Sequence, residues 1–351
     1  MPTTRTTRKD VARAAGVSVS TISYVNNNGP RPVSAETRER VLRAIRELDY
    51  APLEAARSLR HKRTRTIGLI LPDTTNPSYS ILVKGVEDTV FAQGWSLLLC
   101  LSGYEATREQ AYAEIMISKQ VDGVLYVLST TDTSPVARLY KRQIPIVAID
   151  REVPGFKLDC VLADNFNGSA AAIHYLLKLG HRHIGLIVRY SSLSNITERI
   201  RGYEWALSQA GIEKNPALVI AGGFGFEEGQ RAIKELLRLD PRPTAVLASP
   251  DVVAIGAIRG AIDAGLQVPG HISVVGFDDI PVSSSISPSL TTVALPIWEM
   301  GRMAAEMLLK RIQAQEEEWS PERIVLPAHL VIRESTGAVT EAHSLLAGGD
   351  E

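Results

Sequence analysis

The sequence predicts a small all-α head over residues 1–50 and a larger α/β body of two doubly wound parallel sheets over residues 66–338. In the head, apolar residues recur with helical spacing behind capping residues. In the body, short apolar runs alternate with helical stretches, first in one series and then in a second. A chain of 351 residues, 45% of them hydrophobic, is long enough for more than one core.

Three short helices are expected in the head, each beginning after a hydroxyl side chain that can cap it: Thr7, Ser18 and Ser34. The first helix, Lys9 to Ala15, ends at Gly16, and the second runs to about Asn27. The inward-facing apolar residues are Val11, Ala12 and Ala15 in the first helix, Ile22 and Val25 in the second, and Val41, Ile45 and Leu48 in the third.

The segment between the first two helices, Ala14-Ala15-Gly16-Val17-Ser18, combines small residues with a glycine at the turn. Small residues let two helices cross closely, as in a helix-turn-helix motif. The second helix presents four hydroxyl side chains away from its apolar side: Ser18, Ser20, Thr21 and Ser23. Such a helix fits a DNA major groove and bonds phosphates and base edges. A plain three-helix bundle, the alternative, explains the apolar stripes but not the hydroxyls.

The formal charge is unevenly distributed. Residues 1–65 hold 14 Lys and Arg against 6 Asp and Glu, whereas residues 66–351 hold 24 against 33. A basic head on an acidic body suggests a polyanion as the partner of the head. A solvated charged face is the alternative that charge alone leaves open.

A strongly basic segment, residues 51–65, separates head and body. Ala55, Ala56 and Leu59 would share one side of a two-turn helix, which is too short to be stable alone in water. A disordered basic linker is therefore expected in the absence of DNA.

The body contains two series of buried strands: Ile67–Leu71, Leu97–Leu101, Val121–Leu128 and Ile144–Ile149, then Ile184–Val188, Leu218–Ala221, Ala245–Ala248 and Ser273–Phe277. Helices are expected near 79–93, 106–119 and 135–142, and then near 167–179, 198–210, 227–238 and 252–265. Doubly wound sheets bind ligands at the carboxyl ends of their strands, so two lobes can share one cleft.

Polar residues follow these strands: Asp73, Asn76, Ser129, Asp150, Arg151, Asp251, Asp278 and Asp279. Any one of them could be only a helix cap or a turn residue. Together they predict a polar site along one edge of both sheets.

The motifs KDVARAAGVSVSTISYVNNN and VSAETRERVLRAIRELDY, with RTIGLILPDTTNPSY, VDGVLYV and ISVVGFDDIP in the body, closely resemble the lactose-repressor/galactose-repressor family of bacterial transcriptional regulators. The resemblance runs from about Thr7 to Gly337. It implies periplasmic-binding-protein-like lobes joined by three crossings, near Asp164, Thr291–Leu295 and Leu326. The first lobe is then about 66–163 plus 293–325, the second about 164–292 plus 326–338, and 339–351 is a flexible tail.

The resemblance implies that Val19, Ser20 and Tyr24 read bases, and that residues 51–65 fold on DNA as a hinge helix with Leu59 as a minor-groove wedge. The expected DNA-binding set is Thr7, Ser18, Val19, Ser20, Thr21, Ser23, Tyr24, Asn27, Ala56, Leu59 and Arg60. The chain departs from the family pattern at Tyr24, where many members have arginine, and at Asn26, Leu53 and Glu54.

The resemblance also implies an effector between the lobes. The expected effector-binding set is Asp73, Asn76, Ser78, Tyr79, Ser129, Asp150, Arg151, Arg199, Phe224, Asp251 and Asp278. Arg199 and Asp278 suit a hydroxyl-rich sugar, although a nucleoside or another polar metabolite stays open. Pro250 replaces an asparagine common in the family, which indicates a changed ligand set.

An enzyme and an exported solute-binding protein are the rival functions. The sequence shows no GxSxG, P-loop or HExxH motif, and His181 and His183 lack further metal ligands nearby, so no catalytic residue, metal or cofactor is expected. No export signal or membrane span is found, and Cys100 and Cys160 lie in apolar contexts, so a cytoplasmic protein is expected. Because the tail lacks leucine heptads, we expect a homodimer on a palindromic operator.

Overall fold

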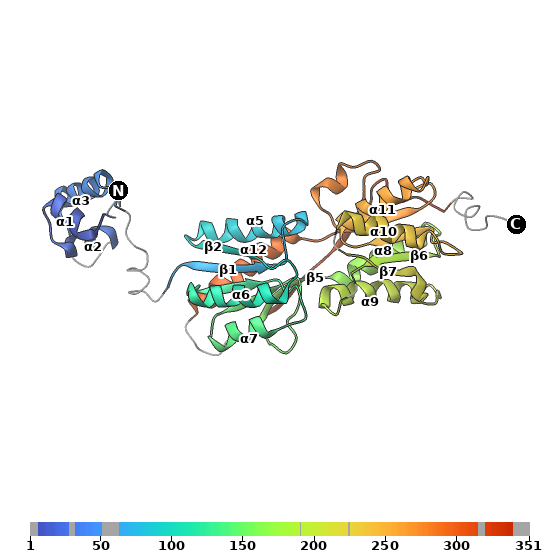
Figure 1. Cartoon of the computed structure of the whole chain (residues 1–351), viewed down its shortest axis with the longest axis horizontal. Coiled ribbons are helices and arrows are strands. Elements are labelled where there is room, and N and C mark those ends of the chain that lie inside the picture. The colour runs from blue at the N-terminus through green and yellow to red at the C-terminus, as the bar shows by residue number, and fades with distance from the viewer. Residues whose placement is uncertain are drawn as a thin grey trace. The chain divides into compact units, whose positions relative to one another are not determined.

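The computed structural model describes residues 6–27, 32–50, 63–189, 191–223, 225–314 and 320–339 (Figure 1). The chain divides into two compact units, one ending at Thr64 and the other beginning at Arg65. The first unit contains the predicted head, and the second contains the predicted body.

The head consists of three helices, α1 (Arg8–Ala15), α2 (Val19–Asn27) and α3 (Ala35–Glu47). The three predicted hydroxyl caps are confirmed, because Thr7, Ser18 and Ser34 accept backbone N–H groups at 3.4, 3.2 and 3.3 Å. Gly16 ends α1 with a left-handed φ of 64°. The core of the head is formed by Val11, Ala12, Ala15, Ile22, Val25, Val41, Ala44 and Tyr50.

The first lobe of the body is built on a six-stranded sheet in the order β11-β5-β4-β3-β1-β2, in which every neighbouring pair is parallel. Its strands are β1 (Thr66–Leu71), β2 (Ser96–Leu101), β3 (Gly123–Tyr126), β4 (Ile146–Ile149), β5 (Asp159–Ala163) and β11 (Arg323–Leu326). One face is covered by α5 (Pro77–Ala92) and α12 (Ile297–Gln313), and the other by α6 (Ala106–Ser118) and α7 (Ser134–Lys141) (Figure 1).

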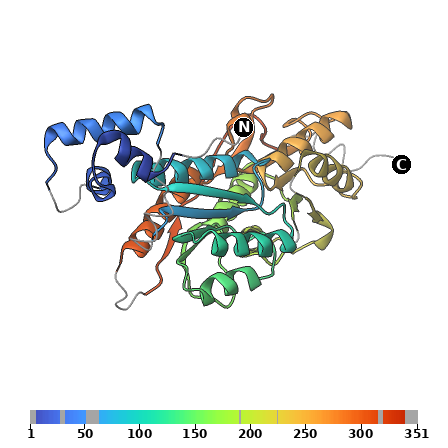
Figure 2. The ribbon, with the colours of Figure 1, turned by 60° about the vertical axis from the view of Figure 1, so that its left-hand side comes forward.

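The second lobe, which includes the yellow and orange helices of Figure 2, repeats this plan with the order β12-β10-β9-β8-β6-β7, and only its β12–β10 pair is antiparallel. Its strands are β6 (Ile184–Val188), β7 (Val219–Ala221), β8 (Ala245–Ala248), β9 (Ser273–Asp278), β10 (Thr291–Ala294) and β12 (His329–Val331). Helices α8 (Asn165–Lys178) and α9 (Ser194–Gln209) cover one face, α10 (Phe226–Leu236) and α11 (Asp251–Asp263) the other. Two short 3₁₀ helices complete the lobe, η1 (Pro216–Leu218) and η2 (Pro281–Ser284).

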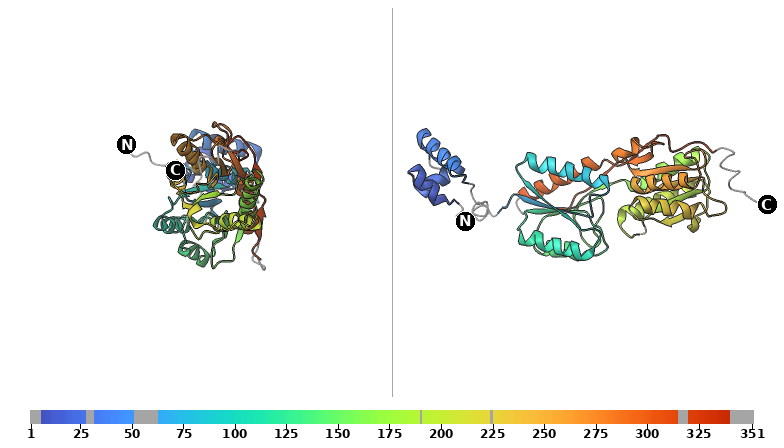
Figure 3. Two further views of the ribbon diagram at one scale, coloured as in Figure 1. Left: turned by 90° about the vertical axis from the view of Figure 1, so that its right-hand side faces the viewer. Right: turned by 45° about the horizontal axis from the view of Figure 1, so that its top comes forward.

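The chain passes between the two sheets three times: after β5, between β10 and α12, and between β11 and β12 (Figure 3). Residues 293 and 294, which the sequence analysis assigned to the first lobe, lie in β10 of the second. Strands β5, β10, β11 and β12 have no counterpart among the strands expected from the sequence. These strands are three to five residues long and lie next to the points where the chain passes between the sheets, so no long apolar run marks them.

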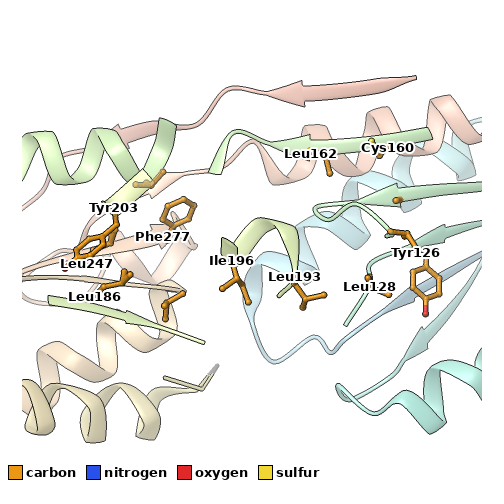
Figure 4. Close-up of a cluster of buried hydrophobic side chains, with 14 of the residues drawn as sticks. Tyr126, Leu128, Cys160, Leu162, Leu186, Leu193, Ile196, Tyr203, Leu247 and Phe277 are labelled. Carbon is orange, nitrogen blue, oxygen red and sulfur yellow. The ribbon is translucent and has the colours of Figure 1, made fainter. Parts of the chain in front are cut away.

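One hydrophobic cluster continues from the first lobe into the second (Figure 4). Leu193 and Ile196, at the start of α9, lie between Leu128 of the first lobe and Phe277 of the second. Both are nearly fully buried, so the start of α9 is part of the apolar joint between the lobes. Cys100 and Cys160 are buried free thiols.

Helix pairs that cover the sheets approach one another at glycines. A Cβ atom on Gly256 of α11 would lie 2.0 Å from the carbonyl oxygen of Phe226 in α10. The same holds for Gly202 of α9, where the carbonyl oxygen of Phe166 in α8 would be 2.3 Å away. Backbone atoms cannot move aside as a flexible side chain can, so these positions exclude a larger residue.

We therefore expect Gly256→Ala to lower the free energy of unfolding by about 1–3 kcal/mol, because the added methyl group forces α10 and α11 apart. Urea unfolding would measure the change. Ile262→Ala is the matched control, since Ile262 lies on the same helix with 40% of its surface exposed. Equal losses in the two variants would contradict the close-packing argument.

Candidate functional site

A cavity lies between the lobes at the carboxyl ends of their strands. Of the effector set expected from the sequence, Asn76, Ser78, Tyr79, Asp150, Arg151, Arg199 and Asp278 line it. The structure adds Arg189, Asn195, Ser249 and Pro250 as further lining residues, with apolar walls from Leu82, Val188, Ile196, Leu295, Ile297 and Met300. The cavity has about 50 Å³ of free space, which suffices for a few water molecules but not for a sugar.

Two hydrogen bonds between asparagine and aspartate cross the cavity in opposite directions. The Asn76 side chain of the first lobe donates to Asp278 of the second at 3.2 Å. In return, Asn195 of the second lobe donates to Asp150 of the first at 2.8 Å. Each lobe thus supplies one carboxylate and one amide donor, and the two lobes are held together directly at the site.

Arg199 projects from α9 into the cavity wall and is fixed from several sides. It donates to Asn165 Oδ1 at 2.7 Å and to Ser249 Oγ at 2.5 Å, and it forms an ion pair with Asp278 at 3.6 Å. Its guanidinium carbon lies 3.9 Å from the centre of the Phe277 ring. Because the guanidinium is held by side chains of the second lobe, it is positioned before any ligand arrives.

Arg151 is the corresponding cation of the first lobe and is only 2% exposed. It donates to the Tyr79 hydroxyl at 2.8 Å and to the Leu128 carbonyl, and it pairs with Asp150 at 3.2 Å. These contacts stabilise a buried charge that would otherwise be strongly unfavourable, although the Nε atom that faces Asp150 has no hydrogen-bond partner among the described residues.

Backbone geometry and electrostatics mark the aspartates of the site. Asp150, Asp278 and Asp279 have left-handed φ values of 68°, 124° and 59°, which non-glycine residues seldom adopt. Burial raises the pKa of Asp278 to about 7, although Arg199 acts in the opposite direction. Burial also raises the pKa of the Tyr79 hydroxyl. Strained backbone and shifted pKa values cluster at functional sites.

Three residues of the expected effector set do not line the cavity. Ser129 donates from its backbone N–H and its hydroxyl to buried Glu109, at 2.9 and 2.7 Å. Asp251 accepts from Ser283, Thr292 and the backbone of Ile280. Asp73 caps its own loop by accepting from Thr75 and from the backbone of Asn76. Phe224 lies outside the described residues.

Two of the added lining residues, Arg189 and Ser249, directly follow strands, so the position of a residue at a strand end can predict them. Arg189 directly follows β6, at the carboxyl end of the strand, where the same rule had selected Asp150 and Asp278. Asn195 is the second residue of α9. Ser249 follows β8 in the same way, and Pro250 stands next to it.

A wider hollow of about 690 Å³ lies next to this cavity, lined by residues 152–158 and 192–194 among others. Three charged side chains line it, and two of them, Glu152 and Arg323, pair with one another at 2.7 Å, while Lys157 is the third. Since polar groups converge in the smaller cavity and its aspartates are strained, the smaller cavity is the candidate ligand site.

In the head, α2 separates an apolar and a polar face. Ile22 and Val25 are buried, whereas Ser18, Ser20 and Val19 are exposed, Val19 to 40%. The Ser18 hydroxyl contacts those of Ser20 and Thr21 at 2.7 and 2.8 Å.

The rest of the expected DNA-binding set is distributed as follows. Thr21, Ser23 and Tyr24 are half-buried, and Thr7 forms a capping box with Asp10. The side chain of Asn27 and all of Ala56, Leu59 and Arg60 lie outside the described residues.

Within the described ranges, no three side chains among His, Cys, Asp and Glu come together as metal ligands. Among the helices of that same part of the chain, none has the length and apolar character to cross a membrane.

The raised pKa of Asp278 predicts a pH-dependent stability. A carboxyl with a raised native pKa stabilises the fold in its protonated form, and this contribution is lost as the pH rises towards and beyond 7. Relative to the native protein, Asp278→Asn should therefore gain about 2 kcal/mol in unfolding free energy between pH 5 and pH 8.

Urea unfolding at the two pH values tests this expectation. Glu213→Gln, which changes an exposed carboxyl outside the site, is the control and should follow the native protein at both pH values. A constant difference between Asp278→Asn and the native protein would show that Asp278 does not titrate in this range.

Comparisons with known proteins agree with this architecture. Residues 7–52 match the family model described as bacterial regulatory proteins, lacI family, and residues 173–336 match a periplasmic binding protein-like domain. The ribose operon repressor of Haemophilus influenzae is 37% identical over 329 residues, covering 94% of this chain and 98% of that protein.

Two solved structures are similar over nearly the whole chain. A complex of the transcriptional regulator CelR with cellobiose has 33% identity and a TM-score of 0.73, covering 94% of this chain and 100% of that one. A lac repressor dimer bound to operator and an anti-inducer has 28% identity and a TM-score of 0.85, covering 95% and 100%. The chain therefore belongs to the lacI family of bacterial regulatory proteins and is a transcriptional regulator with a helix-turn-helix head.

Proposed function

We propose that this chain is a repressor whose affinity for operator DNA is controlled by a small polar effector bound between the two lobes. The observation that carries the proposal is the exposed polar face of α2, where Ser18, Val19 and Ser20 point away from a buried apolar face. A helix that is anchored on one side and presents short side chains on the other fits the major groove.

Base reading is assigned to the exposed part of α2. Val19 offers an apolar contact to a thymine methyl group, Ser20 a hydroxyl to a base edge, and Tyr24 a phenolic group. Thr7, Ser18, Thr21 and Ser23 are assigned to phosphates, which position the head without reading sequence. Tyrosine cannot make the bidentate contact that arginine makes to guanine, so the operator differs from half-sites that are read by arginine at this position.

Effector control follows from the closed cavity. With about 50 Å³ of free space, the site admits a sugar-sized molecule only when the lobes separate and the bonds of Asn76 and Asn195 break. A bound effector then sets a new arrangement of the lobes, with a coupling energy of about 1–3 kcal/mol to DNA binding. The ribose and cellobiose in the names of the related proteins support a sugar or a sugar derivative.

The remaining parts of the proposal concern assembly and location. We assign residues 51–65 to a hinge that folds on DNA, with Ala56, Leu59 and Arg60 in contact with the operator. A homodimer matches a palindromic operator by symmetry, and the related repressor dimer on operator supports it. The protein acts in the cytoplasm on double-stranded DNA, without catalysis and without a cofactor.

The decisive experiment is the selection of bound duplexes from a random DNA library by the full-length protein, at about 100 mM salt because salt governs such affinities. We expect enrichment of a palindrome with two half-sites around a deformable central step. The selection is repeated with a pool of cellular metabolites to supply a corepressor. Failure of both selections with folded, dimeric protein would overturn the regulator function.

Tyr24→Ala tests the assignment of base reading. The variant should relax base preference at one position of each half-site and weaken binding there by about 1–3 kcal/mol. Fluorescence anisotropy with the selected duplex and its single-base variants would measure this. The control is Leu42→Ala, an exposed apolar residue of α3, which should keep the native preference. An unchanged base profile in Tyr24→Ala would remove Tyr24 from the reading set.

A further inference from the structure

We propose that the effector is an anion, a sugar acid or a sugar phosphate, whose charged group binds Arg189 at the cavity between the lobes. The inference rests on the proposed function in that it takes this cavity to be the effector site. It goes further by naming the chemical class of the effector and a residue that selects it.

The charges that line the cavity do not balance. Three guanidinium groups line it, those of Arg151, Arg189 and Arg199, against the two carboxylates of Asp150 and Asp278. Arg151 faces Asp150 at 3.2 Å, and Arg199 faces Asp278 at 3.6 Å. The lining therefore carries an excess of one positive charge when every group is ionised. An enclosed charge excess favours a ligand of the opposite sign.

Partial protonation of Asp278 increases this excess of positive charge. Burial raises the pKa of Asp278 to about 7, so this carboxyl is partly protonated near neutral pH. The two carboxyls that line the cavity thus neutralise its three guanidinium groups only in part.

The environment of Arg189 disfavours its own charge. Burial lowers the pKa of its guanidinium, and the nearby Arg151 acts in the same direction, although Tyr104 opposes them. An anion placed between Arg189 and Arg151 would relieve the repulsion between the two cations. A neutral sugar would leave it unchanged.

The position of Arg189 suits it to act on both lobes. It follows β6 in the second lobe and is half-buried, and its guanidinium carbon lies 5.1 Å from the ring centre of Tyr104, which follows β2 in the first lobe. A guanidinium offers a planar fork that bonds a carboxylate or a phosphate through two parallel N–H groups. An anion bound there would thus lie beside groups of both lobes, which must move apart when the cavity opens.

The test uses full-length protein and two small anions, acetate and inorganic phosphate, with chloride at equal ionic strength as the reference. Thermal unfolding followed by intrinsic fluorescence reports binding, because a ligand that binds only the native state raises the midpoint. We expect acetate or phosphate, up to tens of millimolar, to raise the midpoint of the native protein above the chloride value. The anion with the larger effect distinguishes a sugar acid from a sugar phosphate.

Two variants separate this site from general binding to basic surfaces, including the head. Arg189→Gln should weaken the apparent anion affinity at least fivefold. Arg231→Gln removes an exposed arginine on the outer helix α10 and should keep the native response. Equal responses in Arg189→Gln and the native protein, or no response to either anion beyond chloride, would overturn the proposal.

The DNA selection described above keeps the two proposals distinguishable. An enriched operator together with no Arg189-dependent anion effect would remove only the anionic effector. An Arg189-dependent anion effect without any selected operator would leave an anion site in a protein that lacks the proposed regulatory function.

Discussion

The buried contact of Asp278 with Asn76 and Arg199 is the interaction on which the arrangement of the two lobes depends. A carboxylate at this depth is tolerated only with partners, and its partners come from both lobes: an amide at 3.2 Å from the first and a guanidinium at 3.6 Å within its own. The contact with Asn76 therefore cannot form unless the lobes are closed. In the closed state the polar groups that line the cavity bond to one another.

Because these polar groups bond to one another across the cavity, little free space is left inside it. Ligand groups that enter must replace bonds that already exist, so affinity depends on how well they reproduce them, as in any exchange of one hydrogen bond for another. Ligand hydroxyls can donate the hydrogen bonds that Asp150 and Asp278 accept from asparagine. The excess of arginines on the same walls favours a negative charge on the ligand, which hydroxyls do not supply.

Much of the fold was predictable because local patterns determine it. Capping hydroxyls such as Thr7 and Ser34 bond residues three positions away, so they can be read from a few letters of sequence. Buried parallel strands such as β6 and β8 appear as plain apolar runs. Strands β11 and β12 are only partly buried and short, so their register depends on partners that sequence spacing does not reveal.

The cavity was predictable only in part, for the same reason. Strand ends indicated an edge of the sheet, and Asp150 and Asp278 line the cavity there. The rule does not say which way a side chain turns. Asp251 turns towards Ser283 and Thr292, and Ser129 towards Glu109, and these partners lie 20 to 41 residues away along the chain. Helix α9 shows what such distant contacts achieve: Leu193 and Ile196 fill the apolar joint, while Asn195 and Arg199 line the cavity. Because one rigid helix carries both sets, a ligand that displaces the polar set must also shift the apolar joint, and effector binding is thereby coupled to the packing between the lobes.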